Sequence, residues 1–190
     1  MFNDLYCLTD AAIVGYKTNT RRIEGKDQFQ EMAACADQIF YNEDTGLIDF
    51  MFEGIDIFNY KPRYKVGEVV AVAQCYNDVV REFTDLAFVP GNTNKMFVRA
   101  EVMPHQIRIT GIRCERLQDI SDEDCMREGI RQFTPDFPKD FPIHPTHFVV
   151  GNILKNTPRE AFAALIDRVS GKGTWKKNPW VVAYEFELVK

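Results

Sequence analysis

The residues best suited to chemistry lie close together near the start of the chain. The segment Gly15–Arg22 contains a glycine, a lysine, two threonines and two arginines. Lys17 and Thr20 are three residues apart, and on a turn or a helix end that spacing brings both side chains to one face. A desolvated lysine amine can accept the proton of a threonine hydroxyl, which then attacks. The segment therefore indicates either a nucleophile with its base or, on spacing alone, a solvated basic turn.

Arg21 and Arg22 add a second function to the same segment. Guanidinium groups bind phosphate or carboxylate through paired hydrogen bonds. Residues 4–14 read as a short helix that Gly15 ends, and cations next to a helix C-terminus meet a favourable dipole. The arginines therefore suit ligand binding, although their place after a helix also suits a structural role.

A third candidate lies more than a hundred residues further along. Ser121 can cap a short helix, and Asp124 stands at the position that completes a variant of the capping box. Acidic residues in the first turn suit the helix dipole, but Glu128 lies at the C-terminal end, where a carboxylate is disfavoured. Helix chemistry therefore leaves Glu128 unexplained, and it becomes a candidate site residue.

The composition is that of an ordinary globular protein. The chain has 190 residues, 45% of them hydrophobic and 27% charged, which suits one domain with an aromatic-rich core. The formal net charge of −5 argues against nonspecific coating of nucleic acid but leaves room for a local basic pocket. No stretch resembles a signal peptide or is long enough to span a membrane, so we expect a cytoplasmic protein.

Neither a metal nor another cofactor is expected. Five cysteines are an odd number, they lie far apart, and none forms a C-x-x-C pair, so we interpret them as reduced thiols. His144 and His147 are three residues apart, but Pro145 lies between them and no cysteine flanks them. That arrangement does not match a zinc site.

Hydrophobic periodicity and turn residues predict a few helices and a larger number of strands. Helices are expected at 4–14, at 27–40, after Ser121 and after Thr157. Strands are expected at 47–52, 55–60, 69–73 (buried on both faces), 96–103, 107–116 and 180–188. The proline-rich segment 134–145 is expected to be a loop. Most connections are too short for parallel crossovers, which favours an α+β fold with a mixed or antiparallel sheet curled into a barrel.

Four stretches, in chain order, resemble the ASCH domains, a branch of the PUA-like β-barrel superfamily, and most of all their phage and prophage members. Residues 15–22 are similar to G-[RK]-K-T-x-T-R-R, and residues 64–70 to G-D-x-L-W-V. Residues 103–129 are similar to M-P-x…R-I-T…R-L-Q-D-I-S…E-G, and residues 171–182 to G-x-G-x-W…N-P-W-V. The resemblance covers nearly the whole chain, so we expect one domain over 1–190 with an insertion around 24–60.

The resemblance implies a PUA-like barrel, flanked by several helices, with a cleft for RNA or a nucleotide-like ligand. Small bacterial ASCH proteins include an amidohydrolase that removes the acetyl group of N4-acetylcytidine. Its catalytic lysine and threonine lie in a K-x-x-T motif, and its catalytic glutamate ends the short helix. Those motif positions correspond to Lys17, Thr20 and Glu128.

Three functions follow, and RNA or nucleotide binding in a basic cleft around Gly15–Arg22 comes first. Phosphate would be held by Lys17, Arg21, Arg22 and Arg108, and a base would stack on Tyr76, Trp175 or Trp180. The alternative is an amidohydrolase for an acylated nucleoside that uses Lys17, Thr20 and Glu128. A second alternative is a non-catalytic interaction protein of a mobile element, docking through 134–145.

Overall fold

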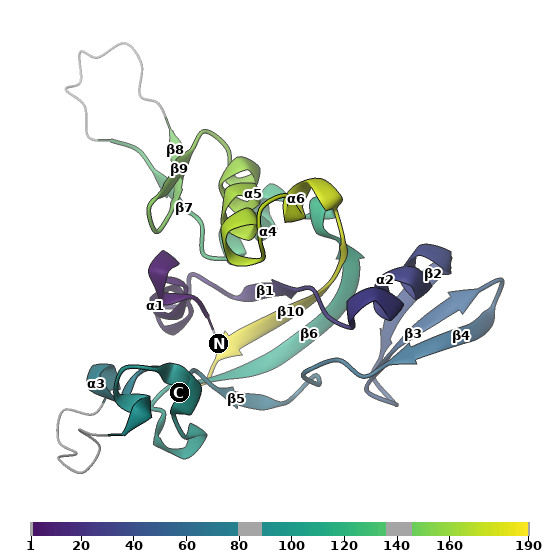
Figure 1. Cartoon of the computed structure of the whole chain (residues 1–190), viewed down its shortest axis with the longest axis horizontal. Helices are drawn as coiled ribbons and strands as arrows, with labels where there is room; N and C mark the ends of the chain where they lie inside the picture. Colours follow the sequence, from purple (N-terminus) through teal and green to yellow (C-terminus); the bar gives the residue numbers. More distant parts are fainter. Residues whose placement is uncertain (1, 80–88, 136–145, 190) are drawn as a thin grey trace.

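Two long antiparallel strands, β6 (Gln106–Arg116) and β10 (Trp180–Leu188), form the centre of the fold (Figure 1). The computed structural model describes residues 2–79, 89–135 and 146–189. Strand β1 (Asn19–Arg22) pairs with β10, and strand β5 (Val69–Ala71) pairs with β6, which gives the order β1-β10-β6-β5. Strand β1 is therefore an edge strand, and its second edge is available to face other elements.

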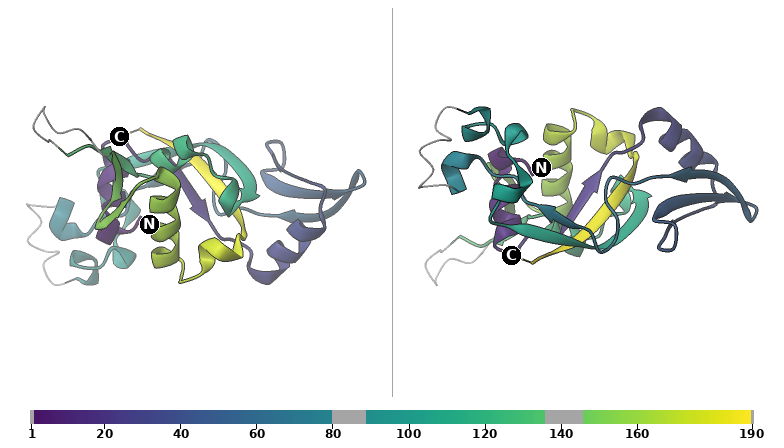
Figure 2. Two further views of the ribbon diagram at one scale, coloured as in Figure 1. Left: turned by 90° about the horizontal axis from the view of Figure 1, so that it is seen from above. Right: turned by 90° about the horizontal axis from the view of Figure 1, so that it is seen from below.

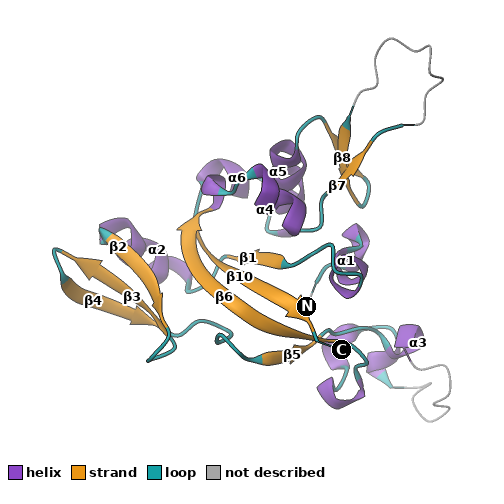
Figure 3. Cartoon of the chain, turned by 180° about the vertical axis from the view of Figure 1, so that it is seen from behind, coloured by secondary structure: helices purple, strands orange, loops and turns teal. Residues whose placement is uncertain are grey.

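Two smaller sheets flank the central one (Figure 3). One contains β2 (Gln38–Asn42), β3 (Leu47–Phe52) and β4 (Ile55–Tyr60), and the other contains β7 (Arg131–Phe133), β8 (His147–Val150) and β9 (Ile153–Lys155). All strand pairs are antiparallel, so the chain is an α+β protein with three antiparallel sheets. In the described residues no sheet closes into a barrel.

The helices lie around the sheets. They are α1 (Leu8–Ile13), α2 (Lys26–Cys35), α3 (Tyr76–Val79), α4 (Asp122–Arg127), α5 (Pro158–Val169) and α6 (Thr174–Lys177). Short 3-10 helices occupy Asp4–Tyr6, Pro90–Asn92, Lys95–Phe97, Ala100–Val102 and Leu117–Asp119. The predicted caps of α4 and α5 are confirmed, because Ser121 Oγ accepts from Asp124 N at 3.0 Å and Thr157 Oγ1 from Glu160 N at 3.1 Å. No helix of the described ranges is long and apolar enough to cross a bilayer.

The core consists of two clusters that meet at β10. Val181 belongs to the cluster beneath α4 and α5, whereas Val182 and Tyr184 belong to the cluster shared with α2 and β3. Neighbouring strand residues point to opposite faces, so β10 supplies both. Tyr184 is fully buried, and its hydroxyl donates to Glu24 Oε1 at 2.9 Å.

Several element predictions were wrong, each for a local reason. The helix expected over 27–40 ends at Cys35, because Ala36 is extended and Asp37 N donates to Met51 O at 2.9 Å, which starts a strand pairing. Segment 69–73 is not buried on both faces, since β5 is an edge strand and Val69 is 47% exposed.

Two further segments also differ from expectation. Residues 96–103 form 3-10 turns instead of a strand. The helix expected over 4–14 is divided at Cys7, whose backbone is left-handed with φ 55°. Of the expected loop 134–145, residues 136–145 lie outside the described part of the chain.

Candidate functional site

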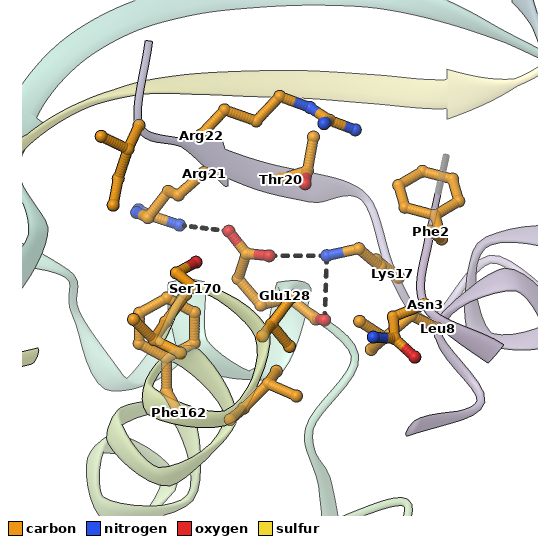
Figure 4. Close-up of a pocket in the computed structure, with 14 residues that line it drawn as sticks. Phe2, Asn3, Leu8, Lys17, Thr20, Arg21, Arg22, Glu128, Phe162 and Ser170 are labelled. Carbon is orange, nitrogen blue, oxygen red and sulfur yellow. Dashed lines mark hydrogen bonds and ion pairs between the residues drawn. The ribbon is translucent and has the colours of Figure 1, made fainter. Parts of the chain in front are cut away.

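Lys17 lies at the centre of the candidate site and is only 2% exposed. Its Nζ donates to Glu128 Oε2 at 2.5 Å and to the Glu128 carbonyl at 3.0 Å (Figure 4). It also donates to the Asn19 carbonyl at 2.7 Å. Three acceptors are the number that an ammonium group can satisfy. The contacts are therefore those of a lysine ammonium paired with the Glu128 carboxylate.

The backbone fixes this pair in place. Gly15 has φ +80° and turns the chain after α1, so that Lys17 N donates to Ala11 O at 2.8 Å. Thr18 N donates to Arg127 O at 2.8 Å, and Lys17 forms an isolated antiparallel bridge with Glu128. The segment between α1 and β1 is thus attached to the C-terminal end of α4, where Glu128 lies.

Arg21 holds the other oxygen of the glutamate. Its side chain is fully buried, and Nη1 donates to Glu128 Oε1 at 3.2 Å. Nε donates to Glu115 Oε1 at 2.6 Å and Nη2 to Asp124 Oδ2 at 2.7 Å. Arg113 bonds the same Glu115 and Asp124, which extends the network along β6. Arg21 is therefore occupied by three carboxylates.

Electrostatics in the site follow from this burial. Loss of water lowers the pKa of Lys17, while the Glu128 carboxylate acts in the opposite direction and Arg22 and Arg21 lower it further. Burial also acts to lower the pKa of Arg21, but Glu128 and Glu115 outweigh it and raise that pKa. The site thus holds a permanently charged arginine next to a lysine whose proton is more easily lost.

A pocket of about 480 Å³ opens over this cluster. Its polar side includes Lys17, Thr20, Arg22 and Glu128, and in Figure 4 the Thr20 hydroxyl points in the direction of the Lys17–Glu128 pair. Its apolar side comes mainly from helix α5, which contributes Phe162, Leu165, Ile166 and Val169. Phe2, Leu8 and Ile23 complete that side. The pocket therefore combines a charged polar end with a hydrophobic wall.

A much smaller cavity of about 30 Å³ adjoins this pocket. Phe2, Thr20 and Arg22 line both spaces. The rest of the small cavity is mostly apolar and comes from residues 70–73, Tyr64, Ile107, Ile109 and Phe186. Its volume suits a group of about the size of one or two water molecules. Thr20 consequently lies at the junction of a large and a small space.

Of the predicted site residues, the structure brings five together in the pocket: Lys17, Thr20, Arg21, Arg22 and Glu128. Gly15 is exposed on the preceding turn and does not line it. Arg108 lies on β6 with its side chain 46% exposed, and it pairs with Glu187 at 3.2 Å. Neither of these two residues contributes to the pocket.

The three aromatic candidates have structural contacts elsewhere. Tyr76 is buried, and its hydroxyl accepts from Arg99 N at 2.9 Å. Trp175 contacts the Phe162 ring at a centroid distance of 6.1 Å, and Trp180 lies 4.8 Å from the Arg116 guanidinium. No aromatic of this set lines the pocket.

Several residues that complete the site cannot be recognised from the sequence. Asp124 read as a helix-dipole residue, although it also anchors Arg21. In the sequence, Glu115 and Arg113 are simply part of a strand. In the sheet, Arg21 and Arg113 pair with Ala183 of β10 from its two sides, so Arg21, Arg113 and Glu115 lie on one face. The apolar residues of α5 read as an ordinary buried stripe.

The comparisons with known proteins add no relative to this picture. No protein-family model, no curated protein and no solved structure matches the chain. Among the residues that the structure describes, no group of three or more His, Cys, Asp or Glu side chains is placed to hold a metal ion.

Proposed function

We propose that this protein is an amidohydrolase that removes a small acyl group from a nucleoside-like amine. The observation that carries the proposal is the 2.5 Å contact between Lys17 Nζ and Glu128 Oε2, at the base of a pocket that Thr20 also lines. The resemblance to ASCH domains supports it, and we propose that the chain is an ASCH-type protein whose central sheet represents an open PUA-like barrel. Five free cysteines support a place in the cytoplasm.

The resting lysine must first lose a proton before it can act as a base. Its three hydrogen bonds leave no lone pair free. Burial makes the ammonium costly, and the nearest acceptor is Glu128 Oε2. Transfer of one proton across this contact gives a neutral amine and a carboxylic acid, so two buried charges disappear together.

This neutral pair can then serve both halves of the acyl transfer. Thr20 Oγ1 bonds to the acyl carbon while its proton passes to the Lys17 amine. The Glu128 carboxylic acid gives its proton to the amide nitrogen as the carbon–nitrogen bond breaks. The amine leaves, the acyl group remains on Thr20 as an ester, and Lys17 and Glu128 return to their charged forms. Water then hydrolyses the ester with the same pair.

The oxyanion formed during attack needs backbone donors, and the edge of β1 offers one. The N–H groups of Gly15, Lys17 and Thr18 already donate to carbonyls within the chain. Phe186 N donates to Thr18 O, so alternate residues of β1 bond to β10. By that alternation, Arg21 N–H points to the unpaired edge of the strand. We propose it as the oxyanion donor.

The pocket favours a small neutral ligand over an RNA strand. Lys17 and Arg21 are already neutralised by carboxylates, and Arg108 is paired at the surface. The 30 Å³ cavity beside Thr20 suits the methyl group of an acetyl, while the larger pocket with its α5 wall suits a heterocycle. One observation favours nucleotide binding as the alternative function. Arg22 lines both the pocket and the small cavity, and a guanidinium group can bind phosphate.

The test is release of acetate from N4-acetylcytidine and from other N-acylated nucleosides at micromolar enzyme. We expect turnover by the wild type, and a loss of at least about 1,000-fold in kcat/KM for Thr20→Ala, because the attacking group is gone. Thr18→Ala is the matched control, since it removes the same hydroxyl two residues away and should retain activity. Absence of turnover with every acylated nucleoside, or full activity of Thr20→Ala, contradicts the proposal.

A further inference from the structure

The negative charge of this chain is concentrated in one segment. Residues 24–60 contain nine Asp or Glu and a single Lys, a net charge of −8. The whole chain has 28 acidic and 23 basic residues, so the remainder has 19 acidic and 22 basic residues, a net charge of +3. Such asymmetry creates a local field that steers association with oppositely charged partners.

This segment forms a unit that projects from the body. It comprises α2 and the sheet β2-β3-β4, here named the acidic sheet, which extends away from the central sheet in all views (Figures 1 and 2). Phe29, Ile48 and Phe50 are fully buried in the core that it shares with β10. The other end, where β3 turns into β4 after the Phe52–Ile55 pair, projects from the body (Figure 1). The acidic sheet is therefore anchored at one end and open at the other.

The open end is apolar as well as acidic. Three large hydrophobic side chains near this end are between 38% and 67% exposed: Phe52, Ile55 and Ile57. Phe52 and Ile55 face each other across the last pair of β3 and β4. An exposed apolar group with a polar rim is typical of a protein interaction site.

The carboxylates of the acidic sheet have no cationic partner within the described residues. None of the ion pairs that the structure contains involves a residue of 27–60. Glu53 and Asp56, next to the exposed Ile55, are themselves exposed. Their charge therefore acts outward, on whatever approaches the tip.

We propose that the acidic sheet docks on a protein surface that is positively charged and has an apolar centre. The apolar tip supplies the contact area, and the carboxylates around it select a cationic rim. Tip-to-tip pairing of two copies is disfavoured, because two tips of the same sign repel each other. Nucleic acid is excluded for the same reason.

The experiment measures binding of two fluorescent peptides to the full-length chain. One peptide has Lys and Leu at helical spacing, so that it presents an apolar face, and the other has the same number of Lys but Ser in place of Leu. We expect the Lys/Leu peptide to bind at least about tenfold more tightly, because only it can cover the apolar tip. Amide shifts in an NMR titration should be concentrated in 38–57, and binding should weaken with salt.

Variants at the tip separate the contribution of its apolar side chains from that of its carboxylates. Phe52→Ser/Ile55→Ser should reduce Lys/Leu binding to the Lys/Ser level, and Glu53→Gln/Asp56→Asn should weaken both peptides. Asp10→Asn/Glu101→Gln neutralises two exposed acids of the body and is the matched control, for which we expect no change. The proposal would be overturned if the two peptides bound with equal affinity, or if the control variant lost as much affinity as the tip variants. Amide shifts located on the body instead of the acidic sheet would overturn it as well.

Discussion

The candidate site and the acidic sheet differ in the burial and the pairing of their charged side chains. In the site, Lys17 and Arg21 are buried and each is matched by carboxylates within 3.2 Å. In the acidic sheet, carboxylates such as Glu53 and Asp56 are exposed and have no cationic partner among the described residues. Buried pairs are expensive to desolvate but fix geometry, whereas exposed unpaired charges cost little and act at a distance.

This difference indicates what each region is built to do. A buried pair that could be replaced by hydrophobic residues without loss of stability needs another reason to be present, and catalysis is such a reason. Exposed charges of one sign contribute little to stability, but they select partners. Substitutions in the two regions should therefore differ in kind as well as in size.

The largest expected effect is on stability, from Lys17→Met. Removal of the lysine leaves the Glu128 carboxylate buried with only Arg21 as its cation, so we expect the free energy of unfolding to fall by about 3–5 kcal/mol. Glu53→Gln in the acidic sheet should change it by less than about 0.5 kcal/mol. Urea denaturation of both variants measures the contrast.

A double variant sharpens this comparison. Lys17→Met/Glu128→Gln removes both charges of the pair while the amide can still accept from Arg21, so it should recover part of the lost stability. Equal destabilisation by Lys17→Met and Glu53→Gln would show that burial of the pair has no energetic consequence.

The next effect is on catalysis, from Arg21→Lys. Arg21 contacts Glu128 Oε1 and not open solvent, so we treat it as a positioning residue for the glutamate. A lysine cannot reproduce its three carboxylate contacts, and kcat should fall by about 10- to 100-fold with little change in KM. Arg22→Lys is the control, because Arg22 lines both the pocket and the small cavity and should alter KM. A rise in KM alone for Arg21→Lys would restore its predicted role as a ligand-binding residue.

Local chemistry allowed several elements of the fold to be predicted. Strands 47–52 and 55–60 and the caps of α4 and α5 depend on neighbours in sequence, and all were confirmed. Segments 69–73 and 96–103 have the same apolar character but different neighbours in space. Their burial depends on which strand lies beside them, and sequence periodicity does not contain that information.

The site shows the same limit at the level of single residues. Glu128 was detectable because a carboxylate conflicts with the end of α4. Asp124 was not detectable, since an acidic residue in the first turn of a helix is already explained by the helix dipole. The structure shows that Asp124 also binds Arg21. Trp175 and Trp180 are able to stack on a base, but in the structure their rings contact Phe162 and Arg116. When a residue type is already explained by its place in a helix or strand, the sequence does not reveal a further contact with a distant residue.

The smallest but most specific effect is on the pH dependence of kcat/KM. The proposed mechanism needs one proton shared between Lys17 and Glu128, so activity should fall at alkaline pH when that proton is lost. Because burial lowers the pKa of Lys17, the fall should be centred below the ordinary lysine value of 10.5. Cys114 and Cys125 cannot cause it, since burial raises the pKa of each thiol to about 12.

Glu128→Gln should invert that profile. Without the carboxylate, the neutral amine of Lys17 forms only by loss of a proton to solvent, so the residual activity should rise with pH. The glutamate also raises the pKa of Lys17, so its removal should place the rise at a lower pH than the fall of the wild type. Rate profiles of both proteins between about pH 6 and 10, around the expected transitions, provide the measurement. A profile of unchanged shape in Glu128→Gln would mean that the pair is a structural contact, and the site would then differ from the acidic sheet only in its burial.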